Sequence, residues 1–162
     1  TWREVAPMPE GRSALAACAI GTHIYVFGGV NEGTKADVYR YDTEANEWST
    51  LAPMPEPRGS HSVSVLDGVV FVLGGRDGSN RLSSVSRFDP ASGSWSSVAP
   101  MPHARSAHSA CAVDGCMYVI GGHDGRQRLR SVLKYDVALG SWSEVAPMNT
   151  ARCQFGRCQY SR

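Results

Sequence analysis

The sequence lacks long apolar runs, and none of its 162 residues belongs to a stretch near the roughly 20 residues that a membrane-spanning helix needs. It also lacks the apolar spacing of an amphipathic helix. Net charge is small, at +1, with basic and acidic residues evenly mixed. Such a balance produces no strong field toward nucleic acid or an anionic membrane. We therefore expect neither as a partner.

Cysteines are few, and their spacing shows no pairing pattern. Their number is odd and no Cys-x-x-Cys occurs, which argues against a disulfide framework or a zinc site. We expect reduced thiols that fill small spaces in a cytoplasmic protein. The five positions are Cys18, Cys111, Cys116, Cys153 and Cys158.

Catalytic motifs are also missing. The sequence has no Ser-His-Asp order, nucleophile elbow, phosphate-binding loop or His-x-Glu metal pair. His61 and His108 share one repeat position, so we interpret them as structural residues rather than metal ligands. We expect a protein that is not an enzyme, without catalytic residues, metal or cofactor.

Three segments share one pattern that begins with an arginine and ends with a tryptophan. In each copy the arginine stands sixteen residues before the first glycine of a pair, and an aromatic residue followed by aspartate comes next. A tryptophan follows that aromatic residue by seven positions, Pro-Met comes five residues later, and the next arginine ten residues after the tryptophan. Such regular spacing indicates a repeat protein. The arginines and glycine pairs are Arg12 with Gly28-Gly29, Arg58 with Gly74-Gly75, and Arg105 with Gly121-Gly122.

Each copy contains four segments with the pattern of short strands, here named a to d. In the second copy strand a spans 62–66 and strand b spans 69–73, joined by Asp67-Gly68, a dipeptide typical of tight hairpins. Strand b is apolar on both faces and must be covered on both sides. It should end at the glycine pair. Strand c carries the aromatic residue and strand d the tryptophan, which would fill the wider outer part of the fold.

The glycine pair, Tyr-Asp, Trp and Pro-Met-Pro at this spacing resemble the kelch repeat, most closely that of the kelch-like proteins, which join a BTB domain to a β-propeller. The resemblance implies an all-β fold in which each copy is one four-stranded antiparallel propeller blade. We interpret residues 1–162 as one kelch-repeat domain. Its parts are the end of a preceding repeat at 1–9, full repeats at 12–48, 58–95 and 105–142, and an aborted fourth repeat at 152–162.

Three blades cannot close a ring, because closed propellers have about 4 to 8. Kelch-like propellers usually have six blades, so the chain resembles an incomplete half-propeller. We expect a piece of a longer parent, with an open fragment and a homodimer that completes a six-bladed ring as the alternatives.

The loops between strands b and c differ among copies and are polar, which favours a binding role. Those of the second and third copies are basic, and an arginine-rich rim suits an acidic peptide because arginine contacts a carboxylate with two donors. Loops that are basic by chance are the alternative. The arginines are Arg76, Arg81, Arg126, Arg128 and Arg130.

In the kelch-like family, partner peptides bind the face formed by the b–c and d–a loops. Matching positions here are the opening arginines, the serine after two of them, the residue after the glycine pair, and a basic residue five positions further. Because the arginines recur in every copy, a structural role for them is equally open. The residues so implied are Arg12, Ser13, Lys35, Arg58, Arg76, Arg81, Arg105, Ser106, His123 and Arg128.

Departures at four positions limit this match. Gly59 replaces the serine in the second copy, and neither Val30, Arg76 nor His123 is aromatic, as the residue after the glycines often is in the family. The same class of peptide therefore does not follow from the resemblance.

The leading functional hypothesis is a substrate-recognition module of an adaptor for a cullin-RING ubiquitin ligase, which the BTB portion of a parent chain would engage. An actin-binding scaffold is the second hypothesis, and a kelch oxidase or specifier protein the third. One branch of the family has sensor cysteines, which would make Cys153 and Cys158 the candidates here. A half-propeller without function of its own is the remaining reading.

Overall fold

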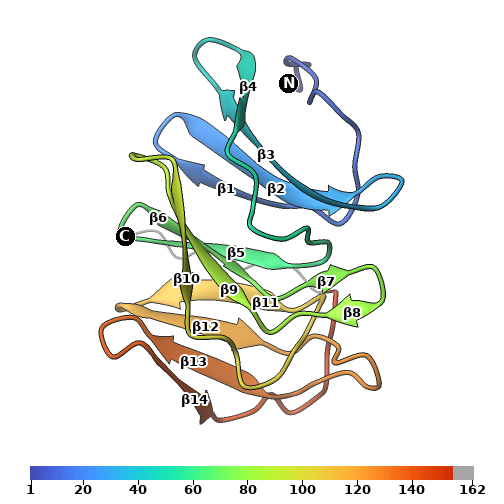
Figure 1. Cartoon of the computed structure of the whole chain (residues 1–162), viewed down its shortest axis with the longest axis vertical. Helices are drawn as coiled ribbons and strands as arrows, with labels where there is room; N and C mark the ends of the chain where they lie inside the picture. The colour runs from blue at the N-terminus through green and yellow to red at the C-terminus, as the bar shows by residue number, and fades with distance from the viewer. Residues whose placement is uncertain (155–162) are drawn as a thin grey trace.

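The structure, a computed structural model, describes residues 1–154, which form strands, turns and loops but no helix (Figure 1). Three four-stranded antiparallel sheets follow one another along the chain, one for each copy of the repeat. This confirms the expected all-β fold of three propeller blades. No helix in the described range could therefore cross a bilayer.

Blade 1 consists of β1 (Ala16–Ile20), β2 (His23–Val30), β3 (Thr34–Asp42) and β4 (Glu47–Leu51). Blade 2 consists of β5 (Ser62–Leu66), β6 (Val69–Leu73), β9 (Val85–Asp89) and β10 (Ser94–Val98). Blade 3 consists of β11 (Ser109–Val113), β12 (Cys116–Ile120), β13 (Val132–Asp136) and β14 (Ser141–Val145).

The blades lie side by side in chain order, with blade 2 between the other two (Figure 1). Strand β5 packs beside both β1 and β11, so the a strands gather on a common inner side. Small side chains on these strands allow that close approach. The a–b hairpin of blade 2 turns at Asp67 and Gly68, whose φ angles are 51° and 76°. Both angles are left-handed, as the predicted tight turn requires.

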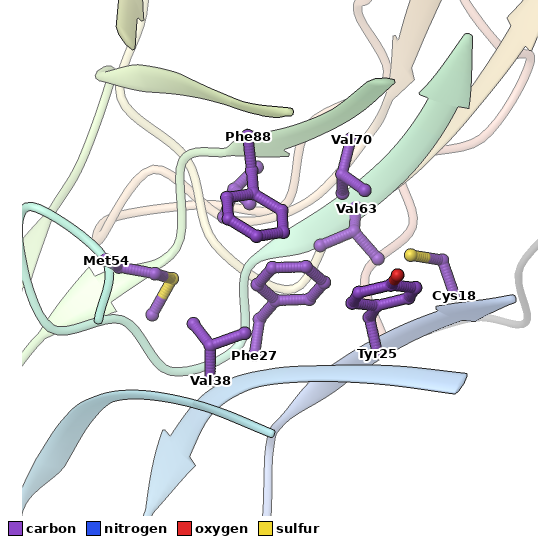
Figure 2. Close-up of a cluster of buried hydrophobic side chains, with 9 residues drawn as sticks. Cys18, Tyr25, Phe27, Val38, Met54, Val63, Val70 and Phe88 are labelled. Carbon is purple, nitrogen blue, oxygen red and sulfur yellow. The ribbon is translucent and has the colours of Figure 1, made fainter. Parts of the chain in front are cut away.

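Two apolar cores fill the spaces between the blades, one at each seam. The first seam joins blades 1 and 2, and Figure 2 shows Phe27 of β2 facing Phe88 of β9, with ring centroids 6.1 Å apart. The second seam joins blades 2 and 3. Strand β6 contributes to both seams, because its successive side chains point to opposite faces. Val70 and Val72 enter the first core, whereas Phe71 and Leu73 enter the second, so the predicted two-sided burial of strand b is confirmed.

Each seam also carries the same backbone contact. The N–H of the second glycine donates to the carbonyl of the next copy's opening arginine, as Gly75 does to Arg105 at 2.9 Å. A Cβ at Gly74 would lie 2.7 Å from that same carbonyl oxygen and 2.7 Å from Cε of Met101. The glycine pair and the Pro-Met motif therefore pack against each other, and the methionine side chain lies over the first glycine.

The tryptophan of each blade joins that blade to the segment that precedes it. The Trp95 ring packs against Phe88, with centroids 4.8 Å apart, and its indole Nε1 donates to the carbonyl of Ala52 at 3.1 Å. Trp48 and Trp142 make the equivalent bonds to Ala6 and Ala99. The strand c aromatic residue and the strand d tryptophan pack against each other in all three blades.

The end of strand b differs from the prediction in blade 1. Strands β6 and β12 end before their glycine pairs, but β2 continues to Val30 across a bulge between Phe27 and Gly29. The connection to β3 is short, and residues 31–33 reverse the chain with Glu32 and Gly33 at φ 50° and 135°. A turn this short leaves the flanking residues close enough to stay paired.

A further element absent from the prediction is a ribbon in the b–c loop of blade 2, formed by β7 (Arg76–Asp77) and β8 (Asn80–Arg81). The expected fourth copy is described only at its beginning. Its opening residue Arg152 bonds to Gly122 and Leu129 through its backbone, as the earlier opening arginines do with the preceding blade. The remainder of that copy, including Phe155, Arg157, Cys158 and Gln159, lies outside the described residues.

Candidate functional site

The opening arginine of blade 2 is buried, and both terminal nitrogens of its guanidinium are hydrogen-bonded within its own repeat. Nη1 of Arg58 donates to the carbonyls of Gly74 at 2.8 Å and Ser84 at 2.9 Å. Its Nη2 donates to Glu56 at 2.5 Å and to the hydroxyls of Ser84 and Ser86 at 2.9 and 3.3 Å. Burial lowers the pKa of the Arg58 guanidinium, and the neighbouring Glu56 charge opposes that shift. Arg58 therefore fastens the b–c connection to the strands below it.

Arg12 and Arg105 occupy the same place in their blades. Arg12 donates to the Gly28 carbonyl at 3.2 Å and to the Tyr39 hydroxyl at 3.0 Å, and its guanidinium also lies over the Tyr39 ring. Arg105 donates to the Gly121 carbonyl at 3.0 Å. The side chains of all three opening arginines are 0% exposed. The structure thus gives them the structural role that the sequence left open.

Five of the residues expected in the binding face meet at one hollow on the loop face of the second seam. This seam hollow has a volume of about 310 Å³. Arg76 and Arg81 reach it from the β7–β8 ribbon, and His123 and Arg128 from the b–c loop of blade 3, with Ser106 between them. Its lining contains three arginines and no aspartate or glutamate.

The ribbon holds two of these arginines in place. Arg76 and Arg81 are paired across it, and each guanidinium donates to a carbonyl of the turn, Gly78 at 3.0 Å and Ser79 at 2.9 Å respectively. Nε of Arg81 is buried and has no hydrogen-bond partner among the described residues. Each guanidinium therefore keeps donors that are not used by the turn.

His123 is fixed by its backbone and by its ring. Its backbone pairs with that of Ser106 through bonds of 3.0 and 2.9 Å, which joins the b–c loop to the start of strand a. Its Nδ1 accepts from the N–H of Gly125 at 2.8 Å. The neutral ring therefore carries its proton on Nε2, where it can donate to a ligand.

The other predicted residues lie elsewhere. Ser13 pairs with Val30 through its backbone in blade 1, and Lys35 forms an ion pair with Glu10 at 3.2 Å, which neutralises the blade 1 part of the rim. Arg126 lines a separate hollow on the outer side of the same blade 3 loop. Of the predicted basic loop residues in the described part of the chain, Arg76, Arg81 and Arg128 therefore meet at the second seam.

Sequence reasoning missed Cys153 and Gln154 in the lining of the seam hollow. A signal was present, because Cys153 follows Arg152 as Ser106 follows Arg105. Cys153 is a free, half-buried thiol.

His61 and His108 line a different hollow, of about 260 Å³, between the a strands on the inner side of the blades. Burial is the main reason that the pKa of each falls to about 3, and the adjacent guanidiniums of Arg58 and Arg105 add to the effect. The rings face the carbonyls of Phe27 and Leu73 in the preceding blades, although the geometry falls short of a full hydrogen bond. Residues 1–154 contain no group of three or more potential metal ligands.

Comparison with solved structures supports the fold. The structure of YjhT aligns with a TM-score of 0.85 over 93% of this chain and 56% of that one, at 21% sequence identity. Two curated relatives match over about one blade. Kelch-like protein 25 of Xenopus tropicalis is 38% identical over 48 residues, and Kelch-like protein 4 of Homo sapiens is 41% identical over 49 residues.

Each match covers 30% of this chain and less than a tenth of the relative, 8% and 7% respectively. The family comparison extends much further. A family model described as the KLHDC2/KLHL20/DRC7 Kelch-repeats domain matches residues 1–161. With the glycine, methionine and tryptophan contacts repeated at each seam, the chain belongs to this kelch-repeat family.

Proposed function

We propose that the chain is a non-enzymatic protein-interaction module that holds an acidic segment of a partner in the seam hollow. The observation that carries this proposal is the convergence of Arg76, Arg81 and Arg128 on one hollow whose lining has no carboxylate. Arginine is suited to the task because its planar donors bind both oxygens of a carboxylate. Two of the three arginines are held by a ribbon, so less side-chain freedom is lost on binding.

We further propose that this module selects substrates for a cullin-RING ubiquitin ligase. Membership of the kelch-repeat family and the similarity to two kelch-like proteins support an interaction role. The ligase would be engaged through another part of a parent protein, and this module would only bind and position the substrate.

Charge reversal tests the seam hollow. In the variant Arg81→Glu/Arg128→Glu, affinity for fluorescein-labelled acidic peptides should fall at least about tenfold, because two attractive charges become repulsive. Fluorescence anisotropy measures the affinity, and thermal unfolding should be little changed because neither side chain belongs to an apolar core. The matched control is Arg3→Glu/Arg87→Glu, which changes the net charge equally at exposed positions outside the hollow.

Equal affinity in the two double variants would contradict the proposal. Cosedimentation with actin filaments, without peptide binding, would instead favour a cytoskeletal scaffold. Both measurements use the whole 162-residue chain.

A further inference from the structure

The opening arginines of the first two blades are paired with a glutamate two residues earlier, but that of blade 3 is not. Glu10 lies 2.6 Å from Arg12, and Glu56 lies 2.5 Å from Arg58. His103 takes the place of the glutamate in blade 3, and its side chain is 67% exposed. No salt bridge among residues 1–154 involves Arg105.

The missing carboxylate leaves Arg105 with fewer partners than its counterpart. Nη2 of Arg58 donates to Glu56, Ser84 and Ser86, whereas the one acceptor of Arg105 Nη2 among residues 1–154 is Ser131, at 3.2 Å. Both guanidiniums are fully buried. The charges of Glu144 and Asp124 raise the pKa of Arg105 against the effect of burial, but neither carboxylate forms an ion pair with it. A buried cation without an ion-paired carboxylate is unfavourable, and an added anion would relieve that penalty.

A hollow of about 520 Å³ lies beside Arg105 on the outer side of the b–c loop of blade 3. We call it the outer hollow, and its polar lining comes from His103, Arg105, Asp124, Arg126 and Ser131. In blades 1 and 2 the glutamates reach the buried guanidinium from the surface while remaining 34% and 35% exposed. Arg105 is itself 0% exposed, so a carboxylate that is not part of the chain would have to displace lining side chains of the hollow to reach it.

Two acidic residues lie near this hollow. Oδ1 of Asp124 accepts the backbone N–H groups of Arg126 and Gln127 at 2.7 and 2.8 Å, so it is engaged in shaping the loop. Oε1 of Glu144 lies 3.9 Å from Nε2 of the exposed His103. Neither carboxylate comes within ion-pair distance of Arg105. Arg126 and His103 supply the other basic groups.

We propose that the outer hollow is a carboxylate-binding site in which a ligand carboxylate contacts Arg105 as Glu56 contacts Arg58. The ligand carboxylate is that of an acidic side chain or of a chain terminus. The site is separate from the seam hollow and does not rest on the function proposed above. Both hollows flank the same b–c loop.

The first test supplies the missing carboxylate. His103→Glu should raise the midpoint of thermal unfolding by about 2–4 °C relative to His103→Gln, which has a neutral side chain of similar length. Equal midpoints would overturn the proposal, because a glutamate there would then gain nothing from Arg105. In the parallel variant Glu144→Gln the midpoint should stay within about 1 °C of the parent. If Glu144→Gln lowered the midpoint as much as Glu56→Gln does, Glu144 would already be the anionic partner of Arg105. That result would also overturn the proposal.

The second test supplies the carboxylate from solution. At constant ionic strength, acetate in place of chloride should raise the unfolding midpoint of the parent chain and of His103→Gln in a saturable way. The rise should be lost in His103→Glu but kept in Arg81→Glu/Arg128→Glu, which separates this site from the seam hollow. An equal rise in His103→Glu, or no rise in the parent chain, would overturn the proposal. N-acetylglutamate α-amide and N-acetylglycine then distinguish a side-chain carboxylate from a terminal one.

Discussion

At the residue scale, the opening arginines account for the most regular spacing in the sequence. Each donates to the carbonyl of the first glycine sixteen residues later, from Arg12 to Gly28, Arg58 to Gly74 and Arg105 to Gly121. The interval is constant because the chain between the arginine and the glycine forms strands a and b, and the hydrogen bond joins the two ends of that segment. A residue repeated for this reason is held inside the blade, whereas Arg81 and Arg128 stand on loops that differ between copies.

His61 and His108 provide a prediction at the same scale. Their folded-state pKa of about 3 lies below the ordinary value of 6.5, so the unfolded chain takes up protons first as the pH falls. The free energy of unfolding should therefore be steady above pH 6.5 and decrease below it, by about 2 kcal/mol per histidine at pH 5. Urea denaturation at pH 7 and pH 5 measures this decrease.

The variant His61→Leu/His108→Leu should lose most of that pH dependence, and Leu15 shows that blade 1 accepts leucine at this position. His103→Gln serves as the control and should retain it. Carboxylates with lowered pKa, such as Asp89 and Asp124, destabilise the fold only when they take up protons, at pH values below about 4. An unchanged pH dependence in the leucine variant would contradict the assignment.

At the scale of elements, each seam depends on a glycine that touches the next copy. Gly74 has φ 53° and its added Cβ would meet Arg105 and Met101, whereas Gly78 of the β7–β8 turn has φ 55° and nothing within 4 Å. Both glycines are therefore favoured by a left-handed backbone conformation, but only at Gly74 would a side chain also collide with its neighbours. The ribbon is an element in which Gly78 lets the chain turn so that Arg76 and Arg81 face each other.

This pair of glycines gives a matched test of the seam. Gly78→Ala should lower the free energy of unfolding by about 1 kcal/mol, the strain of a left-handed alanine. Gly74→Ala should lower it by a further 1–3 kcal/mol or so, because the methyl group displaces Met101 and the Arg105 carbonyl. Urea denaturation compares the two. Equal losses in the two variants would mean that the seam accommodates the methyl group at Gly74 without loss of stability. Gly74 would then be required only for its backbone conformation.

At the scale of the whole molecule, blade 2 is the only one of the three with a described blade on each side. Its strand β6 has side chains in both cores, and Val70, Val72 and Leu73 are each 0% exposed. In repeat proteins stability comes from each unit and from its interfaces with its neighbours. Pairing of two chains into a six-bladed ring, one of the alternatives to a piece of a longer parent, stays a prediction.

Hydrogen exchange should reflect this arrangement. Backbone amides of β6 should exchange more slowly than those of β1 or β14, because opening β6 disrupts both cores and opening β1 or β14 disrupts at most one. Exchange followed by mass spectrometry, with peptides assigned to each blade, measures the difference. Equal protection in all three blades would show that the chain opens as one unit.

The features that the sequence alone determined are local ones. The strand pattern, the Asp67-Gly68 turn and the alternation of β6 depend on residues near one another in the chain, and each could be recognised from composition and spacing. The loop face was located for the same reason, since variable polar loops between regular strands are a local signal. The bulge in β2 and the β7–β8 ribbon were missed because they depend on which short turn the flanking strands accept.

Only the tertiary structure decided which side chains meet across a seam. It buried Arg58 and Arg105, which sequence matching had placed among the binding residues, and it brought Cys153 beside Arg76 from the start of the fourth copy. It also showed that His103 leaves Arg105 without a carboxylate. The physical reason is that burial and charge pairing depend on residues from different copies, whose distances are set when the blades pack together.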